Sequence, residues 1–354
     1  MTYFNEKDKY YYYSFNVLRL ILPLFVCVNS FGVSAISVGS RFVQAICGFA
    51  AVTFFVLSGF LVLGDEDKLD EKLGRAIKRA GIMFGAVFVL YVLFNVIFWL
   101  VTKTDVFPGY DLKSTWFNFI VLNRWPLIIG ENIWFIQCLL YGYIAVFVLK
   151  KFKLLQYDRI IFAVCMALAL LTGEFAGLIN FRILDYTYVP ANVITRSLPY
   201  LLLGRIIARN RDGYKKKKKT VFLIILLGGI MLSVAEYWLL TSFDKLVYSG
   251  HLIGSGVIAA ALVILFSQNK KISKSIDLDF SNGFAKAVYI LHQPIGFVVI
   301  GLVSSFKVEW LAFTVPALPF VLWIIIFIIS LLTKKILNDM FKPVTFTIED
   351  LRKE

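Results

Sequence analysis

The stretch FFVLSGFLVLGDEDKLDEKLGRAIKRAGIMFGAVFVLYVLFNVIFWLV, residues 54–101, alternates apolar and basic segments. An apolar run ends near residue 64, a charged connection with five Lys and Arg follows over 65–79, and a second apolar run covers 80–101. A hydrocarbon core roughly 30 Å thick needs about 20 apolar residues per helix. The stretch therefore predicts two membrane-spanning helices joined by a basic connection.

The same alternation continues along all 354 residues and predicts an all-α, polytopic integral membrane protein with about ten transmembrane helices. Hydrophobic residues make up 59% of the chain and charged residues 17%, which leaves no stretch for a separate soluble domain. We therefore expect one membrane domain over 1–354, with cytoplasmic tails at 1–14 and 334–354. The predicted spans are 15–33, 42–64, 80–101, 132–149, 160–178, 193–208, 220–240, 251–267, 284–304 and 310–333.

Lys and Arg crowd into every second connection, with five in 65–79, four in 150–159 and eight in 205–219. Because cytoplasmic loops carry such an excess, we expect both termini in the cytoplasm, N-in and C-in. The net charge of +14 then reflects topology, and nucleic acid is not an expected partner. The run Lys215–Lys219 flanks a span on this side, although it could also bind anionic lipid headgroups.

The longest connection, 102–131, is expected to face outward. Its middle, TWFNFIVLNRWPLII, is too short and interrupted to span the bilayer, yet too apolar for free solvent. We expect an interfacial or re-entrant segment that lids an outer cavity. Simple anchoring of its tryptophans at the membrane surface is the alternative.

The four cysteines all lie in apolar spans and form no CxxC pair: Cys27, Cys47, Cys138 and Cys165. Cysteines in such places act as small hydrophobic residues. The sequence therefore predicts neither a disulfide framework nor a metal site.

Ionisable residues inside spans are costly, so the polar residues there are the candidate functional groups. His292, in VYILHQPI, lies well inside its span and is the best candidate for proton chemistry. Because Pro294 removes a backbone hydrogen bond nearby, the alternative is a histidine that only stabilises a kink. The others are Arg19, Asn29, Ser30, Glu174, Glu236, His251 and Lys286.

Arg19 and Ser30 are eleven residues apart, which places them almost on one face of a helix and about 16 Å apart along its axis. That face could bind an anion near the cytoplasm and present a hydroxyl farther along. Each residue also has a simpler explanation. Arg19 could reach lipid phosphates, and Ser30 could bond to a backbone carbonyl.

Six segments carry a family resemblance: VLRLILPLFV at 17–26, FFVLSGFLVL at 54–63, KLGRAIKRA at 72–80, NIWFIQCLLYGY at 132–143, YLLLGRIIA at 200–208 and AVYILHQPI at 287–295. In this order they resemble the acyltransferase-3 superfamily of integral membrane acyltransferases, and they cover nearly the whole chain. FFVLSGFL and YILHQPI are the most specific. The family modifies surface polysaccharides, peptidoglycan, lipids or small molecules with acetyl or other acyl groups.

The resemblance implies a site with three parts. Acyl-CoA, a co-substrate and not a resident cofactor, would enter from the cytoplasm with its phosphates held by Arg75, Lys78 and Arg79. The alternative for these cations is a flank that only sets topology. Arg19, Ser30 and His292 would form the catalytic centre. The acceptor would meet Asn29, Trp134, Glu174, Arg196 and Glu236.

One departure from the family concerns the general base. Members typically carry a histidine eleven residues after the first-span arginine, where this chain has Ser30, and no histidine occurs in residues 1–250. Ser30 could be a nucleophile whose base is His292, which then has to lie within about 3 Å. Otherwise the chain is a degenerate member, or a transporter-like or binding relative. The membrane halves of vancomycin-resistance serine racemases resemble this chain and are associated with amino-acid uptake.

The expected function is transfer of an acyl group, acetyl by preference, from cytoplasmic acyl-CoA to a hydroxyl of a cell-surface glycan or lipid-linked sugar. This would be O-acetylation in the cell envelope by a multi-pass protein of a bacterial plasma membrane. The alternatives are a non-catalytic amino-acid transporter or binding protein, and a scaffold for another membrane enzyme. The sequence alone leaves open whether the chain is an enzyme.

Overall fold

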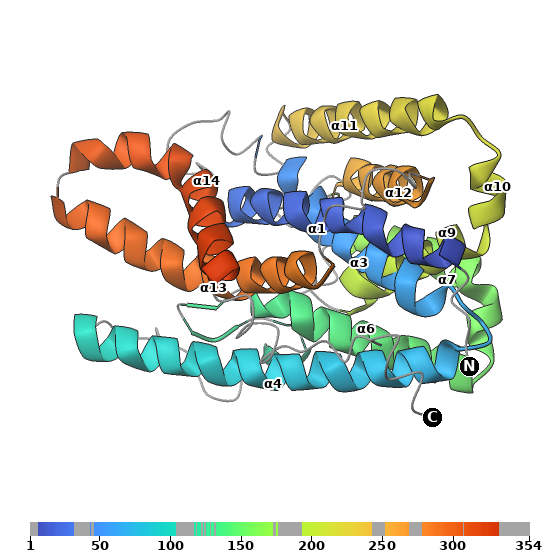
Figure 1. The fold of residues 1–354 in the computed structure, drawn as a ribbon, viewed down its shortest axis with the longest axis horizontal. Coiled ribbons are helices and arrows are strands. Elements are labelled where there is room, and N and C mark those ends of the chain that lie inside the picture. Colours follow the sequence, from blue (N-terminus) through green and yellow to red (C-terminus); the bar gives the residue numbers. More distant parts are fainter. Residues whose placement is uncertain are drawn as a thin grey trace. The chain divides into compact units, whose positions relative to one another are not determined.

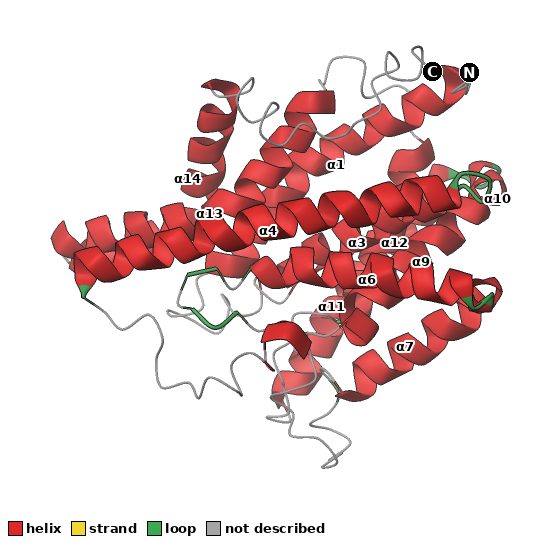
Figure 2. Ribbon diagram, turned by 90° about the horizontal axis from the view of Figure 1, so that it is seen from below, coloured by secondary structure: helices red, strands yellow, loops and turns green. Residues whose placement is uncertain are grey.

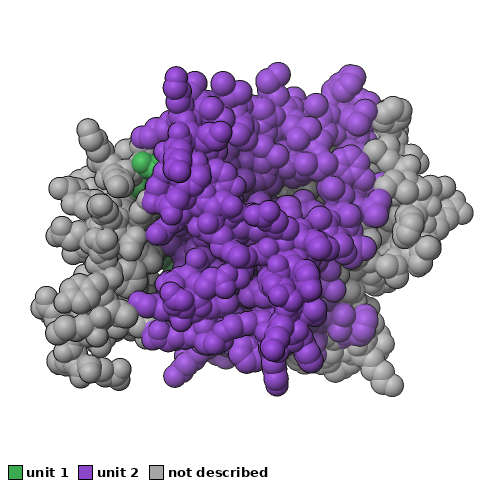
Figure 3. Space-filling model, turned by 90° about the vertical axis from the view of Figure 1, so that its right-hand side faces the viewer, with its two compact units in different colours: residues 1–41, 263–354 green, residues 42–262 purple. Residues whose placement is uncertain are grey.

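The computed structural model describes residues 6–31, 43, 46–103, 117, 119–121, 123, 125–127, 129–130, 132–172, 175, 193–242, 252–268, 278–306 and 308–332. These residues form helices, turns and loops without a strand (Figure 2), which confirms the all-α class for this part of the chain. The chain forms two compact units (Figure 3). Unit 1 comprises residues 1–41 and 263–354, and unit 2 comprises residues 42–262.

Unit 1 is built on three long helices that pack against one another in every pairing (Figure 1): α1 (Glu6–Phe31), α13 (Leu278–Phe306) and α14 (Val308–Leu332). Aromatic rings fill the space between α13 and α14, where Phe284 meets Trp323 edge to face at 5.5 Å between ring centroids. The indole of Trp323 also donates a hydrogen bond to the Leu20 carbonyl of α1 at 3.1 Å. The first and the last described helices are thereby joined in one core.

Unit 2 contains the helices between these ends of the sequence. They are α3 (Phe49–Leu63), α4 (Leu69–Thr102), α6 (Ile133–Lys151), the 3-10 turn η1 (Leu154–Tyr157), α7 (Asp158–Thr172), the π-helical turn η2 (Val193–Ser197), α9 (Leu198–Arg209), α10 (Arg211–Lys215) and α11 (Lys219–Ser242). Helix α12 (Ile253–Gln268) begins in unit 2 and ends in unit 1. In both ribbon views α4 and α6 run side by side (Figures 1 and 2).

Two glycines let α3 and α9 pack backbone to backbone. A Cβ on Gly59 would lie 2.1 Å from the carbonyl oxygen of Leu201, and one on Gly204 would lie 2.1 Å from that of Val56. Small residues allow such close approach between helices in membranes, where packing drives association. The adjacent Ser58 side chain hydrogen-bonds Tyr143 of α6. Three of the family-like segments, 54–63, 132–143 and 200–208, therefore meet in one contact.

The described part of the connection 102–131 folds against α4 and α6. Asn95 of α4 donates to the Ile129 carbonyl at 2.7 Å and accepts from the Ile129 amide at 3.0 Å. Trp125 is buried, donates to the same carbonyl at 2.6 Å and meets Phe88 edge to face. Protein contacts thus hold this part of the apolar middle, as expected of a segment that avoids free solvent. A lid over an outer cavity remains a prediction.

Each predicted span overlaps a described helix. Within the described residues, six helices are long and apolar enough to cross a membrane: Ser14–Phe31, Leu69–Val101, Ile133–Lys151, Leu154–Leu171, Lys219–Ser242 and Phe280–Ile300. The count of ten and the orientation remain predictions. Three helices begin much earlier than expected: the first at Glu6 within the predicted tail, α4 at Leu69 within the predicted connection, and α13 at Leu278 before the predicted span 284–304. The tail 334–354 lies outside the described residues.

Candidate active site

Ser30 and His292 lie in contact within unit 1. Ser30 is in the last turn of α1, His292 is in α13, and the Ser30 Oγ is 3.1 Å from the His292 Nε2. The distance is close to the 3 Å that a serine needs to be activated by a histidine base. Asn29, the predicted acceptor ligand, precedes Ser30 on α1 and is half-buried. Packing of α1 on α13 thus brings together two of the three predicted catalytic residues.

The contact of the other ring nitrogen of His292 determines the tautomer of the imidazole. Nδ1 is 2.6 Å from the Val288 carbonyl oxygen, one turn earlier in α13. A carbonyl can only accept, so Nδ1 carries the hydrogen and Nε2 carries the lone pair. The Ser30 hydroxyl therefore donates to Nε2. A backbone carbonyl here plays the part that a carboxylate plays in a catalytic triad, holding the ring and its tautomer.

An aromatic contact supports this pair. The ring of Phe31 stands nearly perpendicular to the His292 imidazole, with centroids 6.1 Å apart. Gly296, one turn beyond His292, makes room for it, because a Cβ there would lie 2.3 Å from the Phe31 ring. Phe31 follows Ser30 directly, so this packing fixes the end of α1 beside the imidazole. Sequence reasoning missed Phe31 and Gly296, and only the tertiary contact shows their roles.

Arg19, the third predicted catalytic residue, does not join the pair. Its guanidinium donates to the Asn16 side chain at 3.0 Å, toward the start of α1. Eleven residues of helix, about 16 Å, separate it from Ser30. Arg19 is thus separated from the Ser30 hydroxyl, and anion binding at its own level of α1 is the role that remains open to it.

Arg75, Lys78 and Arg79 lie in the first turns of α4, in unit 2. Arg75 and Arg79 are half-buried, Lys78 is exposed, and Arg75 pairs with Glu71 one turn earlier. The guanidinium groups of Arg75 and Arg79 are close enough to repel each other. Helix α4 has 34 residues and is about 51 Å long, well beyond a core of roughly 30 Å. Its length leaves these turns room outside the hydrocarbon.

Lys72, in the same basic segment, pairs with Asp65 at 3.0 Å. Burial alone would raise the pKa of Asp65, but the hydrogen bond and charge of Lys72 outweigh it, so this pKa lies below its ordinary value. Asp65 therefore stays ionised at neutral pH. This pair joins the first turn of α4 to the turn that precedes it.

Trp134 and Arg196, two predicted acceptor ligands, are brought together in unit 2. The Arg196 guanidinium lies 4.9 Å from the centroid of the Trp134 ring, a cation–π contact. Arg196 belongs to η2, and short π-helical turns are frequent at functional sites. Trp134 also packs against Phe55 of the 54–63 segment. An aromatic face beside a cation is a suitable surface for a polar organic ligand.

Glu236 has a structural role. Its buried carboxylate accepts hydrogen bonds from the amides of Ile253 at 3.1 Å and Gly254 at 2.9 Å, the first residues of α12. The first amides of a helix lack intrahelical partners and favour a negative charge. Both oxygens thus serve α12, and the geometry gives no support to the predicted acceptor contact. The predicted ligand Glu174 and the candidate His251 lie outside the described residues.

Arg205 belongs to the stretch 205–219, which the sequence assigns to a cytoplasmic connection, yet it lies within α9 with its side chain 3% exposed. It donates to the Leu63 carbonyl at 2.9 Å and to the carboxylates of Asp158 at 3.2 Å and Glu66 at 2.6 Å. Buried charges need such partners. Its position among apolar residues in YLLLGRIIA was the available signal.

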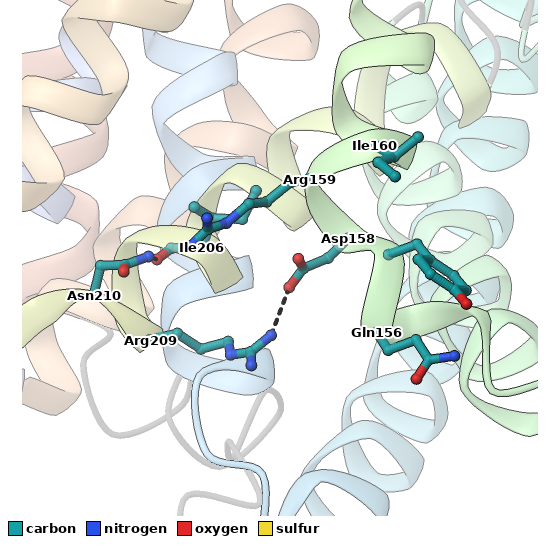
Figure 4. Close-up of a pocket in the computed structure, with 8 residues that line it drawn as sticks. Gln156, Asp158, Arg159, Ile160, Ile206, Arg209 and Asn210 are labelled. Carbon is teal, nitrogen blue, oxygen red and sulfur yellow. Dashed lines mark hydrogen bonds and ion pairs between the residues drawn. The ribbon is translucent and has the colours of Figure 1, made fainter.

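Arg209 also binds Asp158, at 3.1 Å, across a cavity of ≈ 450 Å³ at the ends of η1, α7 and α9 (Figure 4). Its lining comprises Gln156, Tyr157, Asp158, Arg159, Ile160, Ile206, Arg209 and Asn210. The charges of Arg209 and Asp158 offset each other there. The contacts explain how α7 and α9 are joined and assign no ligand.

Comparison with known families matches residues 12–333 to the model of Acyl_transf_3, described as an acyltransferase domain. The matched range covers α1 from residue 12 onward, α13, α14 and the helices of unit 2. Comparisons with curated proteins and with solved structures give no match.

Proposed function

The chain belongs to the acyltransferase-3 family, so we propose that it transfers an acyl group, acetyl by preference, from cytoplasmic acyl-CoA to a hydroxyl of a cell-surface glycan or lipid-linked sugar. The family and the apolar helices make it a membrane protein with an acyltransferase domain. The donor, the acceptor and a bacterial plasma membrane are parts of the proposal.

The contact between Ser30 and His292 is the observation that carries the proposal. The histidine that family members typically have in the first span is replaced by Ser30 in this chain, and the imidazole comes instead from α13. Its Nε2 lone pair points at a hydroxyl, and its Nδ1 is held by the Val288 carbonyl. A positioned base of this kind commonly contributes about 10² to 10⁴ in rate. We therefore assign the role of general base to His292, on α13.

The cations of α4 support coenzyme A as the donor. Arg75 and Arg79 sit half-buried and close enough to repel each other, and a bound phosphate would relieve that repulsion. Guanidinium groups also match phosphate oxygens in geometry. Lys78, exposed on the same helix, adds a third charge. We assign the phosphates of acyl-CoA to these three residues.

The contact of Arg196 with Trp134 supports an acceptor rich in hydroxyl groups. An aromatic face can cover the apolar face of a sugar ring, while a guanidinium donates to its hydroxyls. Both side chains are half-buried, and Arg196 lies in an irregular turn of backbone. Of the predicted acceptor ligands, this contact supports Trp134 and Arg196.

Transport or binding of an amino acid is the second candidate, because Ser30 replaces the histidine usual in the family. In that reading Arg19 or Arg196 would bind a carboxylate. Acyl transfer requires binding of acyl-CoA, whereas transport or binding of an amino acid does not. One measurement of ligand binding therefore separates the two candidate functions.

We would measure the melting temperature of the detergent-purified protein with acetyl-CoA, free coenzyme A and a panel of amino acids. A ligand at 100 times its Kd adds about 2.7 kcal/mol of stability. Saturable stabilisation by acetyl-CoA and coenzyme A is expected. In the double variant Arg75→Ala, Arg79→Ala the affinity should fall about tenfold or more, since each hydrogen bond to a charged group contributes about 1.5–3 kcal/mol.

Lys151→Ala, which removes an exposed cation at the end of α6, is the matched control and should leave the affinity unchanged. Stabilisation by an amino acid, with none by coenzyme A, would reject acyl transfer in favour of transport. Acetyl-CoA affinity that survives the double variant would return Arg75 and Arg79 to a role in topology alone.

A further inference from the structure

The two side chains of the candidate active site differ in exposure. His292 is fully buried, at 0% exposure, whereas Ser30 is exposed. In the tautomer fixed by the Val288 carbonyl, Nε2 holds the single free lone pair of the ring, and the Ser30 hydroxyl occupies it. A substrate therefore meets the oxygen of Ser30 first. While Ser30 stays unmodified, an acceptor hydroxyl cannot deliver its proton directly to the imidazole.

We propose that Ser30 carries the acyl group as a covalent ester between donor and acceptor, so that transfer proceeds in two displacements. This inference rests on the proposed function and adds an acyl-Ser30 intermediate to it. The three requirements of an activated nucleophile are met: an accessible hydroxyl, a base within hydrogen-bond reach, and a third group that orients the base.

In the first displacement, the Ser30 Oγ attacks the thioester carbonyl carbon of acyl-CoA while its proton passes to Nε2. The carbon–sulfur bond breaks, and the departing sulfur takes that proton to leave as the thiol of coenzyme A. The acyl group is now an oxygen ester on Ser30. No electrons are gained or lost, and the histidine is neutral again.

Acylation also explains how the acceptor gains access to the base. An esterified Ser30 has no hydroxyl hydrogen, so the lone pair of Nε2 becomes available. The acceptor hydroxyl gives its proton to Nε2 as its oxygen attacks the ester carbonyl. The bond to Oγ then breaks, and Oγ takes the proton back. The products are an O-acylated acceptor and the original serine.

A covalent intermediate separates the two substrates in time. Coenzyme A leaves before the acceptor reacts, so the site never has to hold both. The first displacement must also run backwards, with the thiol of coenzyme A attacking acyl-Ser30. The protein should therefore exchange the acyl group between acetyl-CoA and coenzyme A when no acceptor is present.

The test is isotope exchange with the purified full-length protein, acetyl-CoA and labelled coenzyme A, without an acceptor. We expect label to enter the acetyl-CoA pool. After quenching in acid, we expect one acetyl group on the peptide containing Ser30, located by mass spectrometry. As an oxygen ester it should resist neutral hydroxylamine and be removed by alkaline hydroxylamine.

Three variants sharpen the result. Ser30→Ala and His292→Gln should each lower exchange by about 100-fold or more, while acetyl-CoA still raises the melting temperature, which shows that they fold. Ser30→Cys should retain labelling, now as a thioester that neutral hydroxylamine cleaves. Ser330→Ala is the matched control, because Ser330 is a buried serine of α14 in the same unit and should exchange as the unmodified protein does.

Exchange that persists in Ser30→Ala, or acetyl label on another residue, would overturn the covalent route. A protein that binds and consumes acetyl-CoA without exchange or label would also overturn it, yet leave the proposed acyl transfer standing. If acetyl-CoA neither binds nor reacts, both proposals fall.

Discussion

At Gly296 the absence of a side chain allows the ring of Phe31 to lie beside His292. In Gly296→Ala the new Cβ would meet the far end of that ring at 2.3 Å, so Phe31 has to turn away and Ser30 shifts with it. A misplacement of about 1 Å can cost about 10²-fold in rate. We expect the rate of acyl exchange to fall about 10- to 100-fold, with acetyl-CoA affinity and melting temperature little changed. Exchange kinetics and thermal unfolding provide the readouts.

Gly85→Ala is the control for this residue, because a Cβ there meets nothing within 4 Å. Gly296 is a positioning residue, so its substitution should lower kcat more than it raises KM. A variant that exchanges at the normal rate would show that Phe31 does not hold Ser30 in place. A clear fall in melting temperature together with the lower exchange rate would indicate a purely structural role.

The sequence singled out both Ser30 and His292, but could not bring them together. The two residues are 262 positions apart, and their contact depends on how α1 packs against α13. The group that orients the His292 ring could not be predicted from the sequence, for another reason. It is the backbone carbonyl of Val288, and a carbonyl has no signature in the sequence. For Glu236 the sequence suggested an acceptor ligand, and only the tertiary structure shows that its carboxylate accepts from the first amides of α12.

At the level of the elements, the contact of α3 with α9 requires glycine at two positions. A methyl group on Gly59 or Gly204 would stand 2.1 Å from a backbone carbonyl oxygen, which cannot rotate away as a side chain can. The helices would have to separate, at a cost of about 1–3 kcal/mol. We expect Gly59→Ala and Gly204→Ala to lower the melting temperature. The melting temperature can be measured by size-exclusion chromatography of heated samples.

The comparison for this contact is Gly228→Ala in α11, where a Cβ meets nothing within 4 Å. Alanine in a helix interior is about 0.5–1 kcal/mol better than glycine, so this variant should be neutral or slightly more stable. If Gly59→Ala were as stable as Gly228→Ala, α3 and α9 would not be packed by their backbones.

The start of α4 shows that mean hydropathy alone misplaces a helix boundary. The charges of 65–79 predicted a connection, but α4 begins at Leu69, because Leu69, Leu73, Ala76 and Ala80 recur at helical spacing and are all buried. A mean over a window dilutes these four residues with the lysines and arginines between them. The helical spacing of the apolar residues indicates the correct start of α4.

At the scale of the whole molecule, orientation in the membrane follows from charge and can be tested without knowing any substrate. The excess of Lys and Arg in alternate connections predicts that both termini and the stretch 205–219 face the cytoplasm, and that 102–131 faces outward. The native cysteines Cys27, Cys47, Cys138 and Cys165 are all buried and unpaired in disulfides, so background labelling should be low.

Four single variants, Lys9→Cys, Lys113→Cys, Lys217→Cys and Lys353→Cys, place one new thiol in each of these regions. A maleimide that cannot cross membranes should label Lys113→Cys on intact cells, and the other three after the membrane is opened. Because an even number of spans puts both termini on one side, Lys9→Cys and Lys353→Cys should always behave alike. Labelling of these two on opposite sides would require an odd number of spans and exclude ten. Reversal of all four would keep the count and invert the orientation, which would also move Arg75 and Arg79 away from cytoplasmic acyl-CoA.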